Sequence, residues 1–506
     1  MTKMSQRVYT PKQVRELDRI AIEEQGVPGY ELMTRAGQAC FSAARDRYPD
    51  THRWLVLCGS GNNAGDGYVI ARLAHQNGVE VRLLAVSDPE QLTGDAALAW
   101  RDYRGSGGEY VAWGDVQAGA PDFSGMDLIV DALLGTGLVR PLKSTYLGIV
   151  QAINASPLPV VAVDIATGLN GASGAPMGDA VYADLTVTFI GLKQGFFVGA
   201  GPDYTGELVY SDLAINPIGT ERVAPALQIF DREQFASLMP PRQRTAHKGD
   251  HGHVLVIGGN SGMGGAVRLA GEAALRGGAG LVSVATRPDN VLALTAGRPE
   301  LMVQGIDVGT DLDALLEQAD VIAIGPGLGT DDWATHVYGR ALAAVKPLVM
   351  DADALNLLAM QPVRRDDWIL TPHPGEAARL LRTDTGAVQA DRIGAVQALV
   401  NKYGGTVLLK GHGTLVASIH AECPWLIQAG NPGMATAGMG DVLTGLTAAL
   451  LAQSCLQETW INATWVDVAA AAGWVHASAG DRAAERGERG LLASDLMQEL
   501  RACLNH

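Results

Sequence analysis

The chain has 506 residues, of which 38 are Lys or Arg and 54 are Asp or Glu, so its formal net charge is −16. A single hydrophobic core rarely serves more than about 250–300 residues, so the length predicts at least two domains. The acidic balance provides no clustered basic face for nucleic acid or an anionic membrane, and we expect neither as a partner.

The predicted elements alternate between helices and apolar strands. Apolar spacing at Val14, Leu17 and Ile20 predicts an amphipathic helix, and a second helix is expected over residues 30–48. Residues 218–228 lack sustained periodicity, and we place a domain boundary there, giving domains 1–220 and 228–506. The expected strands span 55–58, 81–85, 128–131, 160–164 and 185–189, then 254–257, 282–285, 321–325, 347–351, 368–370 and 406–410. This order predicts an α/β fold with two doubly wound, mostly parallel domains.

Cysteine usage and the absence of an apolar leader indicate the compartment. Five cysteines are scattered without a C-x-x-C pair, which is typical of reduced thiols inside the cell. The first residues are polar, and no uncharged apolar run reaches the roughly 18–20 residues of a membrane helix. We therefore expect a cytoplasmic protein.

Glycine-rich turns follow the strands of the first half. The segment GSGNNAGDG (residues 59–67) joins a strand to a helix, where free backbone N–H groups favour a phosphate. Its Asn and Asp side chains suit a hard cation or a polar ring, although they are also common helix caps. Asp131 and Asp164 each precede a further glycine turn. Because ligands bind at the carboxyl ends of parallel strands, Asn63, Asp131, Asp164 and Thr167 are expected to converge on one crevice.

The second half repeats this arrangement with different residues. GGNSGMGGA (258–266), GPGLG (325–329) and DADALN (351–356) follow three expected strands, and no G-K-[ST] of a Walker P-loop occurs. KGHGT (410–414) places a cation and flexible backbone after another strand, whereas His373 taken alone reads as a capping residue. In NPGMATAGMGD (431–441), glycine amides open a long apolar helix beside Asp441. A carboxylate beside an anion hole can take a proton from a hydroxyl that attacks a phosphoryl group.

These strings resemble a known pair of families. The second half is similar to the ribokinase-like superfamily in its G-x-G-D turn, and to its NAD(P)H-hydrate dehydratase branch in the strings quoted above. The first half, with GNNAGDG, DALLGTG and VDIATGLNG, resembles the Rossmann-like NAD(P)H-hydrate epimerase domain. The fusion resembles the bifunctional NAD(P)H-hydrate repair family over nearly the whole chain. One departure is Ala166, where this family pattern has proline in V-D-I-P-S-G.

The resemblance implies two activities: epimerisation of the R and S forms of NAD(P)H hydrate (NADHX or NADPHX), and dehydration of the S form with ADP, giving AMP and phosphate. For the epimerase it implies catalysis by Asp164 and a K⁺ ion on Asn63, Asp131 and Thr167. It implies hydrate contacts in that site from Asn62, Asn63, Ala64, Gly65, Asp66, Gly135, Thr136, Gly137, Leu138, Val139, Arg140, Pro141 and Asp164.

For the dehydratase the resemblance implies that Asp441 is the catalytic base and that Mg²⁺ accompanies the nucleotide. It implies hydrate contacts from Ala266, Gly327, His373 and Asp441, and nucleotide contacts from Lys410, Gly411, His412, Gly413, Thr414 and Gly440. A homo-oligomer, a tetramer or larger, is also expected. Two alternatives remain open from the residues: a ribokinase-like small-molecule kinase with a regulatory first half, and a first half that binds or scaffolds without catalysis.

Overall fold

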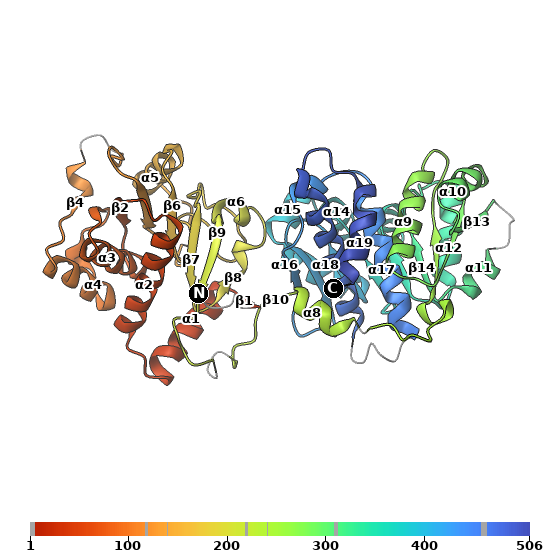
Figure 1. Cartoon of the computed structure of the whole chain (residues 1–506), viewed down its shortest axis with the longest axis horizontal. Helices are drawn as coiled ribbons and strands as arrows, with labels where there is room; N and C mark the ends of the chain where they lie inside the picture. The colour runs from red at the N-terminus through yellow and green to blue at the C-terminus, as the bar shows by residue number, and fades with distance from the viewer. Residues whose placement is uncertain are drawn as a thin grey trace. The chain divides into compact units, whose positions relative to one another are not determined.

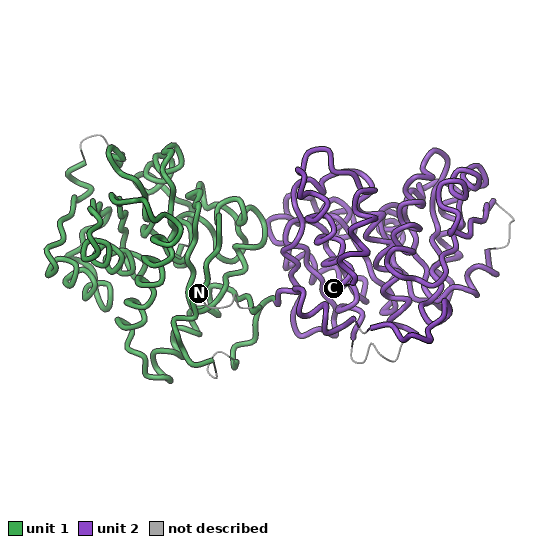
Figure 2. The backbone as a smooth tube through the Cα atoms, in the orientation of Figure 1, with its two compact units in different colours: residues 1–227 green, residues 228–506 purple. Residues whose placement is uncertain are grey.

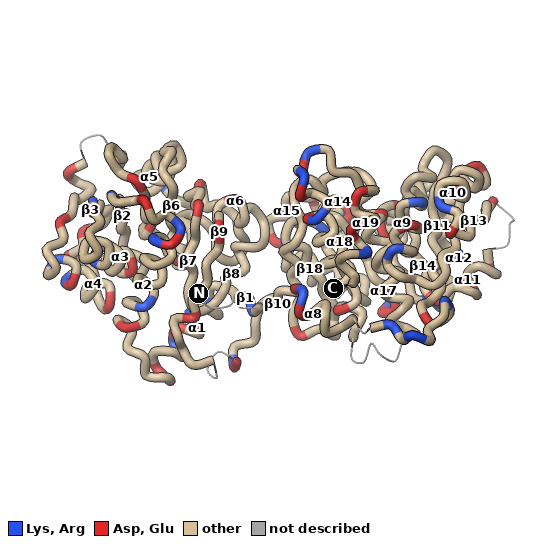
Figure 3. Tube along the Cα trace, in the orientation of Figure 1, with Lys and Arg blue, Asp and Glu red and all other residues tan. Residues whose placement is uncertain are grey.

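A computed structural model describes residues 6–116, 120–138, 140–217, 221–239, 241–307, 312–456 and 463–505. The chain divides into two compact units, residues 1–227 and 228–506 (Figure 2). Basic and acidic residues are interspersed along both units (Figure 3). Each unit has its own buried hydrophobic cluster, so each is described by itself.

The first unit is a parallel sheet covered by helices (Figure 1). Its helices are α1 (Pro11–Arg19), α2 (Gly29–Arg47), α3 (Asn62–Gln76), α4 (Gly94–Gly105), α5 (Ser144–Ala155) and α6 (Gly201–Thr205). Its strands are β1 (Arg7–Tyr9), β2 (Arg53–Cys58), β3 (Glu80–Ala85), β4 (Val111–Ala112), β5 (Leu128–Ala132), β6 (Val160–Val163), β7 (Leu185–Phe189), β8 (Leu192–Lys193) and β9 (Glu207–Ser211).

The strand order of this sheet is β4-β3-β2-β5-β6-β7-β9, and its neighbouring strands are parallel. The chain starts at β2 in the middle, runs outward to β4, and returns to β5 on the other side of β2. This reversal creates a crevice outside the carboxyl ends of β2 and β5, where open α/β sheets bind their ligands. The expected doubly wound, Rossmann-like fold of this half is confirmed.

The second unit is also a mostly parallel sheet covered by helices, and its sheet has more strands than that of the first unit. Its strands are β10 (Leu227–Ile229, beginning at the last residue of the first unit), β11 (His253–Ile257), β12 (Leu281–Thr286), β13 (Met302–Gly305), β14 (Val321–Ile324), β15 (Leu348–Met350), β16 (Trp368–Leu370), β17 (Thr406–Leu409), β18 (Thr414–Ser418) and β19 (Trp425–Ile427). Its helices are α8 (Arg232–Leu238), α9 (Gly264–Arg276), α10 (Val291–Gly297), α11 (Asp313–Gln318), α12 (Asp332–Ala343), α13 (Ala352–Met360), α14 (Pro374–Leu381), α15 (Thr385–Ala390), α16 (Arg392–Tyr403), α17 (Met439–Leu456), α18 (Trp465–Ala483) and α19 (Leu496–Leu504).

The order in this sheet is β13-β12-β11-β14-β15-β16-β17-β18-β19-β10. Strands β11 to β17 are parallel, whereas β18 is antiparallel to both neighbours. The reversal lies between β11 and β14, so the turns after these two strands meet at one edge. This architecture confirms the expected ribokinase-like α/β fold.

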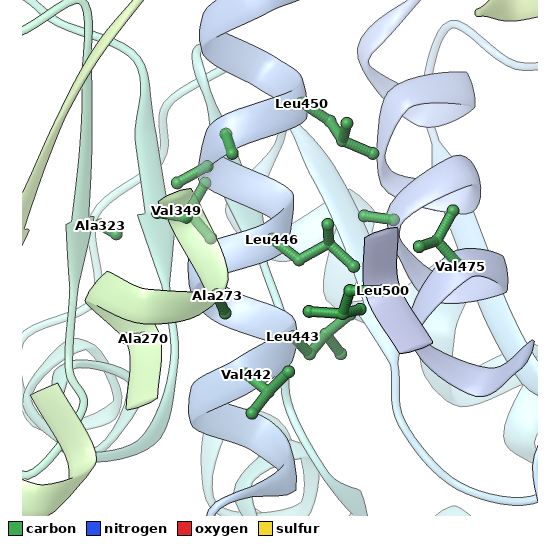
Figure 4. Packing of buried hydrophobic residues seen from close by; sticks show 14 of the residues in the cluster. Ala270, Ala273, Ala323, Val349, Val442, Leu443, Leu446, Leu450, Val475 and Leu500 are labelled. Carbon is green, nitrogen blue, oxygen red and sulfur yellow. The ribbon is translucent and has the colours of Figure 1, made fainter. Parts of the chain in front are cut away.

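Helix α17 is the centre of the second core. By length and composition it could cross a membrane, but 72% of it is buried inside the unit, as in a core helix of a soluble protein. Its Val442, Leu443, Leu446 and Leu450 pack among side chains from α9, α18, α19 and the sheet (Figure 4). This packing fixes the first turn of α17, which carries Asp441, against the strand ends.

All the expected strands are present, but four of them end one residue earlier than the sequence suggests. Asp164, Gly325, Asp351 and Lys410 lie just beyond their strands. Asp164 has φ +67° and Gly325 has φ +129°, conformations that break the extended backbone. The short strands β1, β4, β8, β9, β10, β13, β18 and β19 were not expected, because brief runs give a weak pattern.

Candidate active sites

A cavity of about 770 Å³ opens at the strand reversal of the first unit. Its lining includes residues 60–63, which follow β2, and residues 134–138, which follow β5. Residues of helices α1 and α2 also belong to it. Its charged lining residues are Arg15, Asp18, Asp66, Asp95, Arg140, Asp164 and Lys193. The topology therefore delivers a polar pocket at the place that the sheet rule predicts.

The start of helix α3 provides one wall. Asn62, Asn63 and Asp66 line the cavity, whereas Ala64 and Gly65 do not. Ala64 is fully buried, and a β-carbon on Gly65 would come within 2.6 Å of Met33 in α2. These two residues therefore serve helix packing, and of residues 62–66 only the other three can touch a ligand.

The loop after β5 forms the facing wall. Gly135, Thr136, Gly137, Leu138 and Arg140 line the cavity. A β-carbon on Gly135 would lie 3.5 Å from Asn63, so the two walls approach each other closely. Pro141 is not part of the lining, and Val139 lies outside the described residues.

Asp164 is held in the cavity by a buried lysine. Its left-handed backbone conformation turns it out of the sheet after β6, and its Oδ1 accepts hydrogen bonds from Lys193 Nζ and from Thr188 Oγ1 at 3.3 Å. Lys193 is only 1% exposed and also donates to Thr188 Oγ1 at 2.7 Å. An ion pair this deeply buried is costly unless both charges are compensated.

Two further carboxyl groups share this cavity. Burial raises the pKa of Asp18 in α1 to about 6, with Lys193 opposing and Asp164 reinforcing the shift. Burial also raises the pKa of Asp66 well above its usual value, reinforced by Asp164 and Asp18 and opposed by Lys193. Lys193 is thus shared: it pairs with Asp164, and its charge also opposes the raised pKa of both Asp18 and Asp66.

Asp131 and Thr167 lie together beneath the cavity lining. Thr167 donates its hydroxyl to Asp131 Oδ1 at 2.7 Å and its backbone N–H to Oδ2 at 2.8 Å. Both residues are fully buried, and burial raises the pKa of Asp131 to about 6. The bonds from Thr167 hold the turn that contains Ala166, so local order persists without the proline ring.

A monovalent cation fits the donors around Asp131. The carboxyl group has no ion-pair partner among the described residues, and Asn63 has a buried amide nitrogen that finds no partner there. A buried carboxylate without a counter-charge is unfavourable. Carboxylate, amide and hydroxyl oxygens are ligands that hard cations prefer.

In the second unit, three glycine turns pack backbone against backbone. A β-carbon on Gly258 would meet the carbonyl oxygen of Pro326 at 2.1 Å, and one on Gly325 would meet that of Asp351 at 1.8 Å. Gly327 packs against Ala266, with 3.1 Å between a built β-carbon and the Ala266 side chain. Ala266 and Gly327, which were both expected to contact the hydrate, therefore lie next to each other in one wall.

A buried ion pair lies at the carboxyl ends of β15 and β17. Lys410 Nζ donates to Asp351 Oδ1 at 2.6 Å, and Thr444 Oγ1 of α17 donates to Asp351 Oδ2 at 2.8 Å. Although burial alone would lower it, the pKa of Lys410 is raised because Asp351 and Glu376 lie beside it. The strand ends are thus tied to the first turns of α17.

Asp441, the third residue of α17, lies next to this pair. Burial raises its pKa to about 7, with Asp351 reinforcing and Lys410 opposing the shift. A carboxyl group that titrates near neutrality can accept a proton at physiological pH. A β-carbon on the preceding Gly440 would lie 3.1 Å from Asp351 Oδ2 and 3.2 Å from Lys410 Nζ, so the glycine keeps the helix start close to both groups.

His373 caps helix α14 and reaches the same cluster through Glu376. Its Nδ1 accepts from the N–H of Gly375 at 3.0 Å, and its Nε2 lies 3.3 Å from Glu376 Oε1. Glu376 in turn lies 3.7 Å from Lys410. Burial, followed by the charge of Lys410, lowers the pKa of His373, so the ring is neutral at physiological pH.

Arg392 of α16 fixes the loop that follows Lys410. Its guanidinium donates to the carbonyls of Leu409, Lys410 and Gly413 at 3.2–3.3 Å. Its side chain is buried, which lowers its pKa to about 10 and leaves it charged at neutral pH. Gly411 and His412 are exposed, Gly413 is buried, and Thr414 donates its hydroxyl to the Gly411 carbonyl at 2.8 Å.

Comparisons with known proteins place both halves. Residues 29–195 match the family of the YjeF-related protein N-terminus, and residues 254–502 match the NAD(P)H-hydrate dehydratase family. The bifunctional NAD(P)H-hydrate repair enzyme Nnr of Coxiella burnetii (strain RSA 493 / Nine Mile phase I) is 45% identical over 499 residues, covering 98% of this chain and 99% of that protein. The chain belongs to the bifunctional NAD(P)H-hydrate repair enzyme family.

Other relatives agree. The enzyme of the same name from Escherichia coli (strain K12) is 44% identical over 501 residues, covering 98% of this chain and 94% of that protein. A ribokinase-like superfamily protein from Enterococcus faecalis V583 is similar in structure, with a TM-score of 0.50 and 32% identity over 55% of this chain and 95% of that chain. As a family member the chain is a bifunctional repair enzyme with an epimerase-like N-terminal and a dehydratase C-terminal domain, which favours this function over a small-molecule kinase.

The structure also reveals polar residues that sequence reasoning did not select for the two sites. They are Asp18, Thr188 and Lys193 in the first unit, and Glu376, Arg392 and Thr444 in the second. Asp351 was recognised only as part of a motif. Its place at a strand end, the same signal that selected Asp131 and Asp164, could have identified it.

Proposed function

We propose that the cavity of the first unit binds NAD(P)H hydrate and interconverts its two C6 epimers, with Asp164 as the acid/base residue. The polar lining from Asn62, Asn63 and Asp66 and from the loop 135–138 supports this assignment. The hydrate carries its hydroxyl on a carbon next to the ring nitrogen, so proton transfer at that oxygen is the chemistry that a carboxylate must supply.

Potassium is the proposed ion of this site, held by Asn63, Asp131 and Thr167. The support is the buried carboxyl group of Asp131, with no ion-pair partner among the described residues, and the oxygen-rich donor set around it. When bound, the ion supplies positive charge beneath the substrate pocket. The residues themselves hold the turn on which Asp164 lies.

The second unit is proposed to dehydrate the S epimer at the expense of ADP. Asp441 removes the proton of the C6 hydroxyl, and the resulting oxygen attacks the terminal phosphoryl group of ADP, releasing AMP. The ring nitrogen then expels phosphate, and loss of a ring proton yields NAD(P)H. The observation that carries this proposal is the position of Asp441 at a helix N-terminus beside Lys410, with a pKa of about 7.

The remaining residues are assigned by their neighbours. Lys410, the loop 411–414 and Gly440 hold the nucleotide phosphates, while Ala266, Gly327 and His373 contact the hydrate. Mg²⁺ is proposed to enter with the nucleotide, because no group of three or more His, Cys, Asp or Glu side chains that could hold a metal ion occurs among the described residues and Mg²⁺ is commonly held by one or two carboxylates and phosphates. When bound, it supplies charge against the phosphates.

The location and assembly of the chain are further proposals. All five cysteines are free, which supports a cytoplasmic enzyme. The acidic chain acts on small molecules, without nucleic acid or membrane, as a homo-oligomer of four or more subunits. Light scattering of the purified enzyme measures the subunit number.

One assay tests the two activities separately. The purified enzyme is given pure S or pure R hydrate with ADP or ATP, and the return of NAD(P)H absorbance and the release of inorganic phosphate are followed together. The S epimer should be converted to NAD(P)H without a lag. The R epimer should be converted to NAD(P)H at a higher rate than that of its spontaneous epimerisation without enzyme. A phosphorylated product that accumulates without NAD(P)H would instead indicate a kinase.

A further inference from the structure

The epimerase cavity holds more carboxyl groups than one acid/base residue requires. Asp18 comes from α1, Asp66 from α3 and Asp164 from the turn after β6, and all three line the same cavity. The other charged residues that face it are Arg15, Asp95, Arg140 and Lys193. Which carboxyl group keeps its proton depends on how these charges are paired.

The hydrogen bonds of Lys193 determine which of the three carboxyl groups is paired with its charge. Its ammonium group donates to Asp164, to Thr188 Oγ1 at 2.7 Å and to the carbonyl of Phe189 at 3.4 Å, so its donors are directed to these three acceptors. No hydrogen bond or ion pair to the carboxyl group of Asp66 or Asp18 is formed by the described residues. Lys193 therefore pairs directly with Asp164, whereas its charge acts on Asp66 and Asp18 without a hydrogen bond to either.

We propose that Asp66 is the proton donor of the epimerase reaction, and that Lys193 is a positioning residue that assigns this role to Asp66 by holding Asp164 as the carboxylate. The inference rests on the epimerase role of Asp164 proposed above. A buried carboxyl group without a partner is most stable as the neutral acid. Asp66 is buried in the cavity wall, whereas Asp18 is only half-buried, and burial is the main cause that raises the pKa of Asp66.

The division of roles fits the reaction. Asp66 gives its proton to the C6 hydroxyl oxygen, the C6–O bond breaks with its electron pair going to that oxygen, and water leaves. The lone pair of the ring nitrogen forms a double bond to C6, and the carboxylate of Asp164 stabilises the resulting cation. Water then adds to the opposite face of C6 and gives one proton to the carboxylate of Asp164, which releases it to solvent while Asp66 takes a proton up from solvent, so the enzyme is restored and the other epimer is formed.

Two carboxyl groups with opposed protonation predict a bell-shaped pH dependence of epimerisation. The alkaline limb belongs to the acid of Asp66, whose pKa is raised by burial. The test uses the full chain with the pure R epimer, whose conversion to NAD(P)H requires epimerisation first. The rate with the pure S epimer, which needs only the dehydratase, is measured on each variant as the internal control.

Asp66→Asn should lower kcat of epimerisation by about 10²–10⁴-fold and remove the alkaline limb, because an amide cannot act as the acid. Asp18→Asn, which neutralises the other buried carboxyl group, should cost less than tenfold. A variant Asp66→Asn that retains at least a tenth of the wild-type rate, or a loss larger for Asp18→Asn than for Asp66→Asn, would overturn the proposal.

Lys193→Met keeps the length of the side chain and removes its charge. The alkaline limb of the profile should move to higher pH, because the charge of Lys193 opposes the raised pKa of Asp66. Lys12→Met, an exposed lysine on α1, is the matched control and should leave the profile in place. A Lys193→Met enzyme that is slower with an unmoved profile would reduce Lys193 to a structural residue and overturn its assigned role. Asp164→Asn tests the proposed function independently of both variants.

Discussion

The ammonium group of Lys410 lies 2.6 Å from Oδ1 of Asp351, at the point where the first turn of α17 passes over the strand ends. The pair brings one cation and one anion next to Asp441, with Thr444 of the same helix bonded to the other oxygen of Asp351. The acidity of Asp441, the proposed dehydratase base, is therefore set by the sheet and by α17 together. Local sequence around Asp441 alone does not determine it.

The pH dependence of dehydration follows from this arrangement. The pKa of Asp441 is raised to about 7, and a general base works only when ionised. The rate with the pure S epimer at saturating ADP should therefore rise with pH through about 7 and level off above it. A rate that is flat between pH 6 and 8, with chemistry limiting, would contradict Asp441 as the base.

Asp441→Asn should abolish dehydration without unfolding the second unit, because the side chain is partly exposed at a helix start and outside the hydrophobic cluster. We expect a loss of about 10²–10⁴-fold in kcat for the S epimer. Epimerisation by the same chain, followed by chiral chromatography, should stay unchanged. A near-normal dehydration rate of this variant would contradict the assignment of Asp441 in the G-M-G-D turn as the catalytic base.

Arg392→Met should weaken nucleotide binding without touching the nucleotide. The guanidinium holds three carbonyls of the segment 409–413, and hydrogen bonds from a charged group contribute about 1.5–3 kcal/mol. We expect KM for ADP to rise by about tenfold or more, with KM for the hydrate little changed. Lys402→Met is the control. Lys402 lies at the other end of α16 and donates to the carbonyl of Leu380, so its loss should leave KM for ADP unaltered.

Potassium dependence of the epimerase should follow the hydroxyl of residue 167. Thr167→Ser keeps the oxygen that bonds Asp131 at 2.7 Å and should be mild, whereas Thr167→Val and Asp131→Asn should reduce epimerisation and ion binding together. The measurement is the epimerisation rate in potassium against tetramethylammonium, with thallium or potassium titration for binding. Equal epimerisation rates in potassium and in tetramethylammonium would contradict the proposed dependence on potassium.

Each half should work alone. The two buried clusters contain residues from one unit each, so a fragment of residues 1–220 should interconvert the epimers and a fragment of residues 228–506 should dehydrate only the S form. Mixing the fragments should consume a racemate completely. Consumption of both epimers by the second fragment alone, faster than spontaneous epimerisation, would contradict this division.

Much of the fold and of the pocket walls could be predicted from the sequence, because these features are local. Apolar runs followed by glycine clusters locate the strands and the turns after them, and the rule for parallel sheets places Asn63 and Asp164 at one edge. Strand ends were placed one residue too late at Asp164 and Gly325, since a positive φ leaves no trace in hydrophobicity.

The residues that could not be predicted act across long sequence distances. Asp18 lies on an amphipathic helix and Lys193 ends a two-residue strand, and neither is part of a motif. Their meeting with Asp164 depends on how α1 and β8 pack against the sheet. Likewise, Arg392 has the sequence signature of an ordinary surface residue, and only its burial against the carbonyls after β17 shows what it holds.

The glycine turns at the ends of β11 and β14 have one more consequence. Gly258 and Gly325 touch the main chain of Pro326 and Asp351 so closely that even one methyl group would force the strand ends apart. At these two positions the wall of the proposed dehydratase site therefore consists of peptide groups rather than side chains. In a saturation mutagenesis screen for growth under conditions that damage nicotinamide cofactors, these positions should tolerate no replacement, although neither glycine carries a reactive group. Adaptation of the enzyme to a different nucleotide would have to proceed through the loop 411–414, in which Gly411 and His412 are exposed.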